Sequence, residues 1–208
     1  SYYDDFEQVN MKKGNWLVLA RTKFMLNDLE DTLYSQGLYY QNKFKTNREQ
    51  DLYTAVNDWE NLRKGVDINH DQISRISSYM SEKHFEKNSL KYMDKDARHT
   101  MQSLRERMWL KTNDVWYNAF DNAPQKKVRY IRRMRENGEK LNSTPRITLS
   151  TIHGVKGGEQ DNVVLLTDLS RNTQRNYEQN PDDENRLFYV GATRTKNHLH
   201  VIRPKDIY

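Results

Sequence analysis

Two stretches near the C-terminal end decide the fold: ITLSTIHGVKGGEQDNVVLL at residues 147–166 and ENRLFYVGATRTKNHLHVI at residues 184–202. The first stretch contains two short apolar runs, Ile147–Leu149 and Val163–Leu166, which are rich in β-branched residues and flanked by polar ones. Such runs are typical of strands that are buried on both faces of a parallel sheet. The sequence therefore predicts two parallel strands joined by a polar, glycine-bearing loop.

The second stretch predicts a helix followed by a strand. Residues Glu184–Thr195 are helix-like, with Leu187, Val190 and Gly191 expected on one side, and the alternating segment His198–Ile202 follows. The order strand, polar loop, strand, helix, strand is typical of an α/β domain.

Charged side chains gather at the ends of these predicted elements. They are His153, Lys156, Glu159 and Arg194. Because ligands of α/β sheets bind outside the carboxyl ends of the strands, we expect these four to converge on one crevice there. Arginine presents a fork suited to phosphate oxygens, and glutamate accepts hydrogen bonds from ribose hydroxyls. Taken singly, each of the four is better explained as an ordinary surface charge.

Taken together, the two stretches resemble motifs V and VI of the superfamily 1 helicases of the UvrD/Rep/PcrA type. The first motif stands here as TIHGVKGGE at Thr151–Glu159, and the second as ENRLFYVGATRT at Glu184–Thr195. Both occur in the family's order. Gly158, Gln160 and Thr195 depart from the residues usual in the family.

The resemblance assigns roles to particular residues. Arg194 would be an arginine finger that reaches the γ-phosphate, and Glu159 would contact the ribose. Gly157 is placed with them among the nucleotide-binding residues, and with Lys156 it would shape the loop around Thr151 and His153. Arg186 and Tyr189 would support the motif VI helix. The residues expected to contact single-stranded DNA are Thr151, His153, Lys156 and Arg21.

An earlier segment resembles the opening of the second RecA-like domain of the same family. Trp16–Ala20 is an apolar run that predicts a strand, and it ends in Arg21 and Thr22. Thr22 is a candidate cap for a helix bearing Leu26, Leu29 and Leu33, Gly37 a candidate stop, and Leu38–Gln41 a candidate strand. Arg21 is therefore placed near the nucleotide or DNA face, with simple capping of the strand end as an equal alternative.

Between about Thr46 and Asn142 the pattern becomes helical. Leu52, Val56, Trp59 and Leu62 form one apolar stripe, and the spacing from Leu90 to Met108 predicts a long helix. Trp59 and Trp116 are expected in the core. The basic segment Lys126–Arg135 is either a phosphate-contacting face or a solvated helix. No metal-ligand spacing links His70, His84 and His99, which favours solvated histidines over a metal site.

Composition limits the class of protein. The chain has 208 residues, of which 35% are apolar and 30% charged, with a net charge of +5 and no cysteine. These features exclude disulfides and thiolate metal sites, and no apolar run is long enough to span a membrane. A cytoplasmic setting and a polyanionic partner fit best. The chain opens at Ser1 without methionine, which suggests a piece of a longer protein.

We therefore expect an α/β fold: a RecA-like parallel sheet flanked by helices, with an inserted all-helical subdomain. The expected domains are 1–47 and 142–208, forming domain 2A, and 48–141, a reduced 2B-like insertion. The resemblance implies the C-terminal part of an ATP-dependent DNA helicase that translocates on single-stranded DNA, 3′ to 5′, in replication or repair.

No Walker A sequence is present, so ATP and Mg²⁺ would be held mostly by the first RecA-like domain of the intact enzyme, and this part alone would be inactive. Two alternatives remain open: a DNA-binding helicase-like remnant that does not hydrolyse ATP, and a protein-interaction module.

Overall fold

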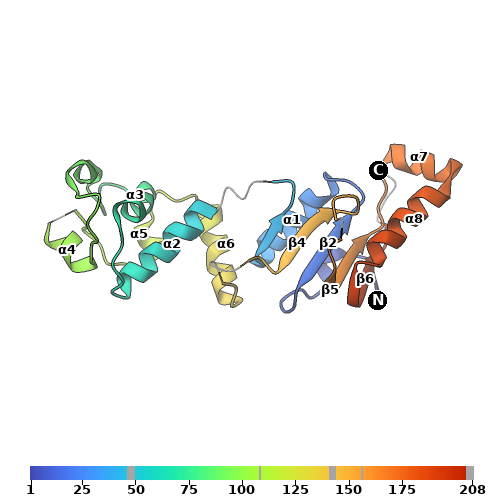
Figure 1. Ribbon diagram of the computed structural model, residues 1–208, viewed down its shortest axis with the longest axis horizontal. Helices are drawn as coiled ribbons and strands as arrows, with labels where there is room; N and C mark the ends of the chain where they lie inside the picture. Colours follow the sequence, from blue (N-terminus) through green and yellow to red (C-terminus); the bar gives the residue numbers. More distant parts are fainter. Residues whose placement is uncertain (46–49, 108, 141–143, 156, 205–208) are drawn as a thin grey trace. The chain divides into compact units, whose positions relative to one another are not determined.

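The computed structural model describes residues 1–45, 50–107, 109–140, 144–155 and 157–204 (Figure 1). The chain forms two compact units. The α/β unit comprises Ser1–Asn47, Glu136–Glu139 and Thr144–Tyr208, and the helical unit comprises Arg48–Arg135 and Lys140–Ser143. The α/β unit is thus built from chain segments on both sides of the helical one. The sequence placed the boundaries after residues 47 and 141.

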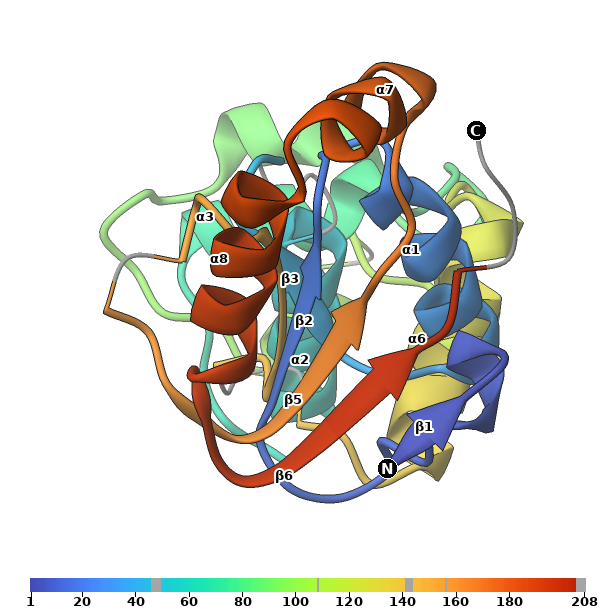
Figure 2. The same ribbon diagram turned by 90° about the vertical axis from the view of Figure 1, so that its right-hand side faces the viewer.

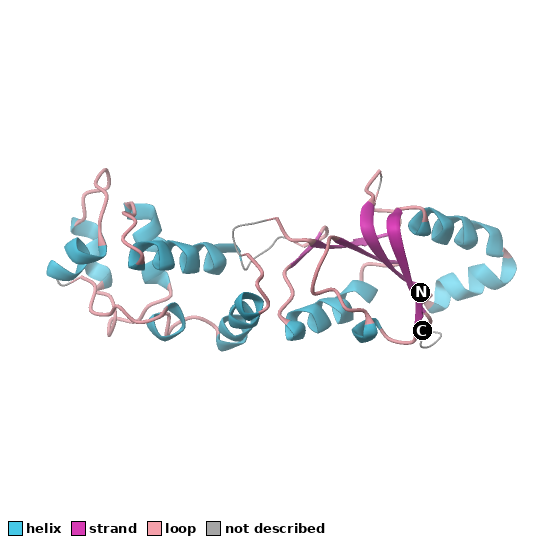
Figure 3. Ribbon diagram, turned by 90° about the horizontal axis from the view of Figure 1, so that it is seen from below, coloured by secondary structure: helices cyan, strands magenta, loops and turns pink. Residues whose placement is uncertain are grey.

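The α/β unit contains one sheet of six strands, all parallel, in the order β1-β6-β5-β2-β4-β3. Figure 3 shows the strands in magenta, with helices in cyan beside them. The strands are β1 Tyr2–Tyr3, β2 Trp16–Ala20, β3 Tyr40–Asn42, β4 Ile147–Thr151, β5 Gln160–Leu166 and β6 Thr195–Ile202. At the centre, Leu17 of β2 pairs with Thr148 on one side and Val163 on the other. The predicted parallel sheet is confirmed, and β2 has the predicted bounds.

Helices cover both faces of the sheet (Figure 2). In this unit they are α1 Met25–Gln36, α7 Arg171–Gln179, α8 Pro181–Ala192 and the short 3₁₀ helix η1 Phe6–Gln8. Val18 and Ala20 of β2 pack in a cluster with Leu29 of α1, whereas Leu17 and Leu19 pack in a second cluster that α8 covers. Successive side chains of β2 point to opposite faces, and because both faces are covered, all five residues are buried.

Helix α8 lies close to the sheet because Gly191 faces it. A Cβ atom at Gly191 would lie 3.0 Å from Leu165 Cδ1 and 3.4 Å from Ile152 Cγ2. Leu187 packs inward one turn earlier, as expected, but Val190 is exposed. The expected inward position of Val190 is wrong because it lies well over 90° around the helix from the face centred on Gly191 and Phe188.

The predicted helix ends are partly confirmed. Gly37 ends α1 in the left-handed conformation at φ 68°, where glycine is favoured. Thr22 does not cap α1, which begins after Phe24 with no side-chain cap.

The helical unit contains α2 Gln50–Arg63, α3 His70–Ser78, η2 Lys87–Tyr92, α4 Met101–Glu106, α5 Trp116–Ala119 and α6 Gln125–Glu136. The predicted stripe of Leu52, Val56, Trp59 and Leu62 is buried, as is Trp116. None of the helices in the described part of the chain is long and apolar enough to cross a membrane.

The long helix expected over Leu90–Met108 is wrong. The 3₁₀ helix η2 ends at Tyr92, and α4 begins only after Thr100, which caps it by accepting a hydrogen bond from Ser103 N. Between them the Asp94 carboxylate accepts from Asp96 N at 2.9 Å. Side chains that bond to nearby backbone groups compete with helix formation, which apolar spacing alone does not reveal. Met108 lies outside the described residues.

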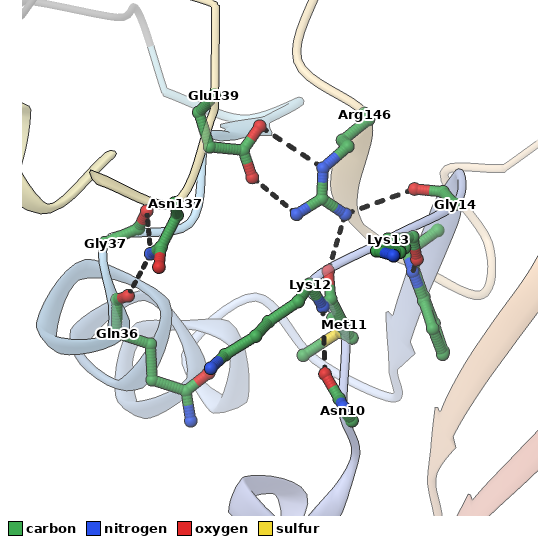
Figure 4. A network of polar contacts seen from close by, with 11 residues as sticks. Asn10, Met11, Lys12, Lys13, Gly14, Gln36, Gly37, Asn137, Glu139 and Arg146 are labelled. Carbon is green, nitrogen blue, oxygen red and sulfur yellow. Dashed lines mark hydrogen bonds and ion pairs between the residues drawn. The ribbon is translucent and has the colours of Figure 1, made fainter. Parts of the chain in front are cut away.

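The chain that returns from α6 is tied to the α/β unit by a polar network (Figure 4). Arg146 donates to the carboxylate of Glu139, to Met11 O at 2.5 Å and to Gly14 O at 3.1 Å. The Asn137 amide donates to the carbonyls of Gln36 and Gly37, at 2.8 and 3.0 Å. These bonds hold the return segment against the end of α1 and the approach to β2.

His200 of β6 predicts that the packing between β1 and β6 is weakened by acid. His200 stacks on Tyr3 with ring centroids 5.5 Å apart, and burial, together with the nearby charge of His198, lowers its pKa. Below the ordinary histidine pKa of 6.5, the unfolded chain therefore binds more protons than the folded one. The contribution of His200 to the free energy of unfolding is fully present above that pH and falls as the pH drops below it. Urea unfolding at pH 7.5 and 5 should show this loss, and His200→Gln should reduce it. An unchanged pH dependence in that variant would contradict the assignment.

Candidate functional site

Three loops meet at the carboxyl ends of β2, β3 and β4. We call this surface the carboxyl edge, and its residues are Arg21, Lys23, Phe44, Thr151, His153 and Gly154. Thr151 ends β4, and its hydroxyl accepts a hydrogen bond from Gly154 N at 3.1 Å. Thr151 is buried whereas His153 is exposed. Thr151 therefore shapes the turn, and His153 is the side chain that the turn presents to solvent.

The chain then crosses under α8 to the opposite end of the sheet. Ile152 and Val155 are buried in a cluster against which Leu187 of α8 packs, so these two residues anchor the crossover in the core. Gly157 adopts φ 70°, which favours glycine. Glu159 follows immediately before β5 and is exposed. Lys156 lies outside the described residues, and its expected DNA contact stays a prediction.

Glu159 and Arg194 lie side by side at the amino ends of β5 and β6, a surface we call the amino edge. The backbone N–H of Gln160 donates to the carbonyl of Arg194 at 3.0 Å, so the two residues are on the same edge of the sheet. The Arg194 side chain is held by a hydrogen bond from Nε to Val190 O at 3.1 Å. Within the described chain its terminal nitrogens have no protein partner.

The sequence prediction that all four charged residues converge at the carboxyl ends is therefore wrong for two of them. His153 is at the carboxyl edge, whereas Glu159 and Arg194 are at the amino edge. The reason is chain direction. The crossover has already returned to the start of β5 at Glu159, and α8 runs antiparallel to the strands, so Arg194 precedes β6.

Arg21 is positioned by a partner that sequence reasoning did not assign. Its Nε and Nη2 donate to the two carboxylate oxygens of Glu184, at 2.7 and 2.8 Å, and Glu184 is buried in the first turn of α8. The hydrogen bond to Glu184 raises the pKa of Arg21, more than burial lowers it. Arg21 lies at the carboxyl edge as expected, but its fork is engaged by protein. The sequence signal that could have identified this partner was Glu184, the first residue of the second motif.

The remaining predicted positions are less constrained. Arg186 and Tyr189 of α8 are exposed, and Arg186 forms a long ion pair with Asp183, at 3.7 Å. In the described residues no group of three or more histidine, cysteine or acidic side chains is arranged to hold a metal ion. The expectation of solvated histidines is wrong for His84 and His99, which are buried.

Comparison with known protein families gives one match. Residues 2–205 match the model of the UvrD-like helicase C-terminal domain. The match includes the carboxyl edge, the amino edge and the helical unit. A search among curated proteins found no match.

The pair of Arg21 and Glu184 should couple strongly in stability. Replacing either residue by alanine leaves a poorly compensated charge, so each variant should lower the free energy of unfolding by about 2 kcal/mol. The double variant should cost little more than one single variant. Urea unfolding measures all three. Asp183→Ala and Arg186→Ala on the same helix are the controls and should each cost under about 1 kcal/mol. Additive losses for Arg21 and Glu184 would contradict the coupling.

Proposed function

The chain belongs to the family of UvrD-like helicase C-terminal domains, and from that premise we propose that it is the second motor domain of an ATP-dependent DNA helicase. In the intact protein it would close with a first RecA-like domain over ATP and Mg²⁺, which that first domain would mostly hold. Coupled hydrolysis would drive translocation on single-stranded DNA and unwinding of duplexes. By family analogy the direction is 3′ to 5′.

The observation that carries the nucleotide part is the adjacency of Glu159 and Arg194 on the amino edge. Phosphoryl transfer spreads negative charge over the transferring group, and a positioned arginine stabilises that charge. Arg194 suits this role because Nε is held by Val190 O while its terminal nitrogens remain for an anion. The exposed carboxylate of Glu159 suits a ribose hydroxyl.

The carboxyl edge suits the nucleic acid. His153 is exposed there beside the buried Thr151 turn, and Arg21 holds the start of α8. The crossover and α8 both run from the carboxyl edge to the amino edge, and they pack on each other through Ile152 and Gly191. In the proposed mechanism, movement of the amino edge toward a nucleotide would reach the nucleic-acid edge through these packed elements.

Arg194 supplies the sharpest test. In the enzyme that contains this domain, Arg194→Ala should lower the turnover number for ATP by on the order of 10³-fold, because the transition state loses its positive charge. Arg175→Ala removes an exposed arginine of α7, outside both motifs, and should leave turnover within about twofold. Steady-state phosphate release with and without single-stranded DNA measures both. Full activity of Arg194→Ala would remove this residue from the nucleotide site.

The isolated chain provides a second test. Because it has no Walker A sequence, it should hydrolyse ATP no faster than buffer does. Appreciable turnover by the purified chain would contradict the assignment of the domain. The coding sequence upstream of Ser1 should encode G-x-x-x-x-G-K-[ST] and a later acidic pair. A start codon close to Ser1 would instead favour a helicase-like remnant that binds DNA without hydrolysis.

A further inference from the structure

An exposed phenylalanine lies over the turn that follows β4. Phe44 keeps 37% of its surface exposed, and its ring tip packs on Gly154. A Cβ atom at Gly154 would lie 2.9 Å from Phe44 Cζ, so the absence of a side chain at Gly154 makes room for the ring. The phenylalanine therefore sits directly beside the turn that carries His153.

The loop that bears Phe44 is held in place by hydrogen bonds. Phe44 N donates to Asn42 Oδ1 at 2.9 Å, and Lys43 N donates to Leu149 O at 3.1 Å. The Asn42 amide in turn donates to Glu30 of α1 at 3.0 Å. Only the part of Phe44 that stays exposed gains nothing for folding, and these bonds fix the backbone so that this part remains at the edge of the sheet.

Positive charge surrounds the ring. The ammonium group of Lys23 lies 4.4 Å from the centroid of the Phe44 ring, a cation–π contact. Lys43, the residue before Phe44, is also exposed, and Phe24, the residue after Lys23, is 53% exposed. Aromatic rings interleaved with cations are the composition of surfaces that bind single-stranded nucleic acid.

We infer that Phe44 is a stacking platform for an unpaired base of a single-stranded nucleic acid, with Lys23 beside it contacting the phosphate backbone. A base offers a flat π-face to the ring, and the phosphate that follows offers a negative charge to the ammonium group. A purely electrostatic surface would need no aromatic ring, and a protein-docking patch would need no adjacent lysine. The inference rests on the proposed function, since it names the residue that the carboxyl edge would use.

The test separates base stacking from phosphate contact. Binding of the chain to fluorescein-labelled dT15 is compared with binding to a 15-mer of the same backbone in which the sugars lack bases. The wild-type chain should prefer dT15 by about tenfold, the scale of one base stacked on an aromatic ring. Phe44→Ala and Phe44→Leu should lose that preference while keeping their affinity for the abasic strand. Lys23→Ala should weaken binding to both strands.

Two further variants separate base stacking from a structural role of Phe44. Tyr2→Ala removes another exposed aromatic ring of the α/β unit, on β1, and should leave the preference for dT15 unchanged. Phe44→Trp should keep the preference and add tryptophan fluorescence that dT15 quenches and the abasic strand does not. A merely structural role for Phe44 would weaken binding to both strands equally.

Three other results would overturn the stacking role of Phe44. If the wild-type chain binds dT15 in a salt-sensitive way and Phe44→Ala retains the full preference for bases, the platform is overturned while the nucleic-acid edge stands. If the wild-type chain does not bind either strand at low salt, the platform and the nucleic-acid part of the proposed function are both overturned. Retained ring-dependent binding to a protein, without binding to dT15, would assign the patch to docking instead.

Discussion

The ion pair of Arg21 with Glu184 joins the end of the central strand β2 to the first turn of α8, and the geometry of both edges depends on it. Removing two charges from water is costly, so the pair persists only because two hydrogen bonds satisfy it at once. Since α8 is fixed at its first turn and packs closely at Gly191, Arg194 is carried to the amino end of β6. A helix held at one edge thus positions a cation at the other.

This arrangement places unlike chemistry at opposite ends of one rigid sheet. The amino edge carries a carboxylate and a guanidinium on adjacent strands, and the carboxyl edge carries a histidine, a lysine and an aromatic ring on three loops. The chain between β4 and β5 connects them, and its residues Ile152 and Val155 are buried beneath α8. In the proposed function, a domain with two such edges would link events at a nucleotide with events on a strand, because packed elements move as bodies rather than bending.

Much of the α/β unit follows from local pattern. The β-branched runs predict the strands because such residues, buried on both faces, suit a parallel sheet, and Gly37 ends α1 as its free backbone allows. The helical unit was less accessible. Apolar residues from Leu90 onward repeat at helical spacing, yet Asp94 and Thr100 divide the segment by bonding to neighbouring backbone groups. The spacing of apolar residues indicates which side chains are buried, but those side chains can be buried without one continuous helix.

The sequence alone determined the parallel sheet, the insertion of a helical segment and the motifs that mark Glu159 and Arg194, because periodicity and short motifs are local properties of the chain. Only the tertiary structure decided which edge each residue occupies, that Arg21 is engaged by Glu184, and that Phe44 lies over Gly154. These facts depend on the direction of α8 and on the path of the crossover. Contacts between residues more than a hundred positions apart have no signature in local spacing.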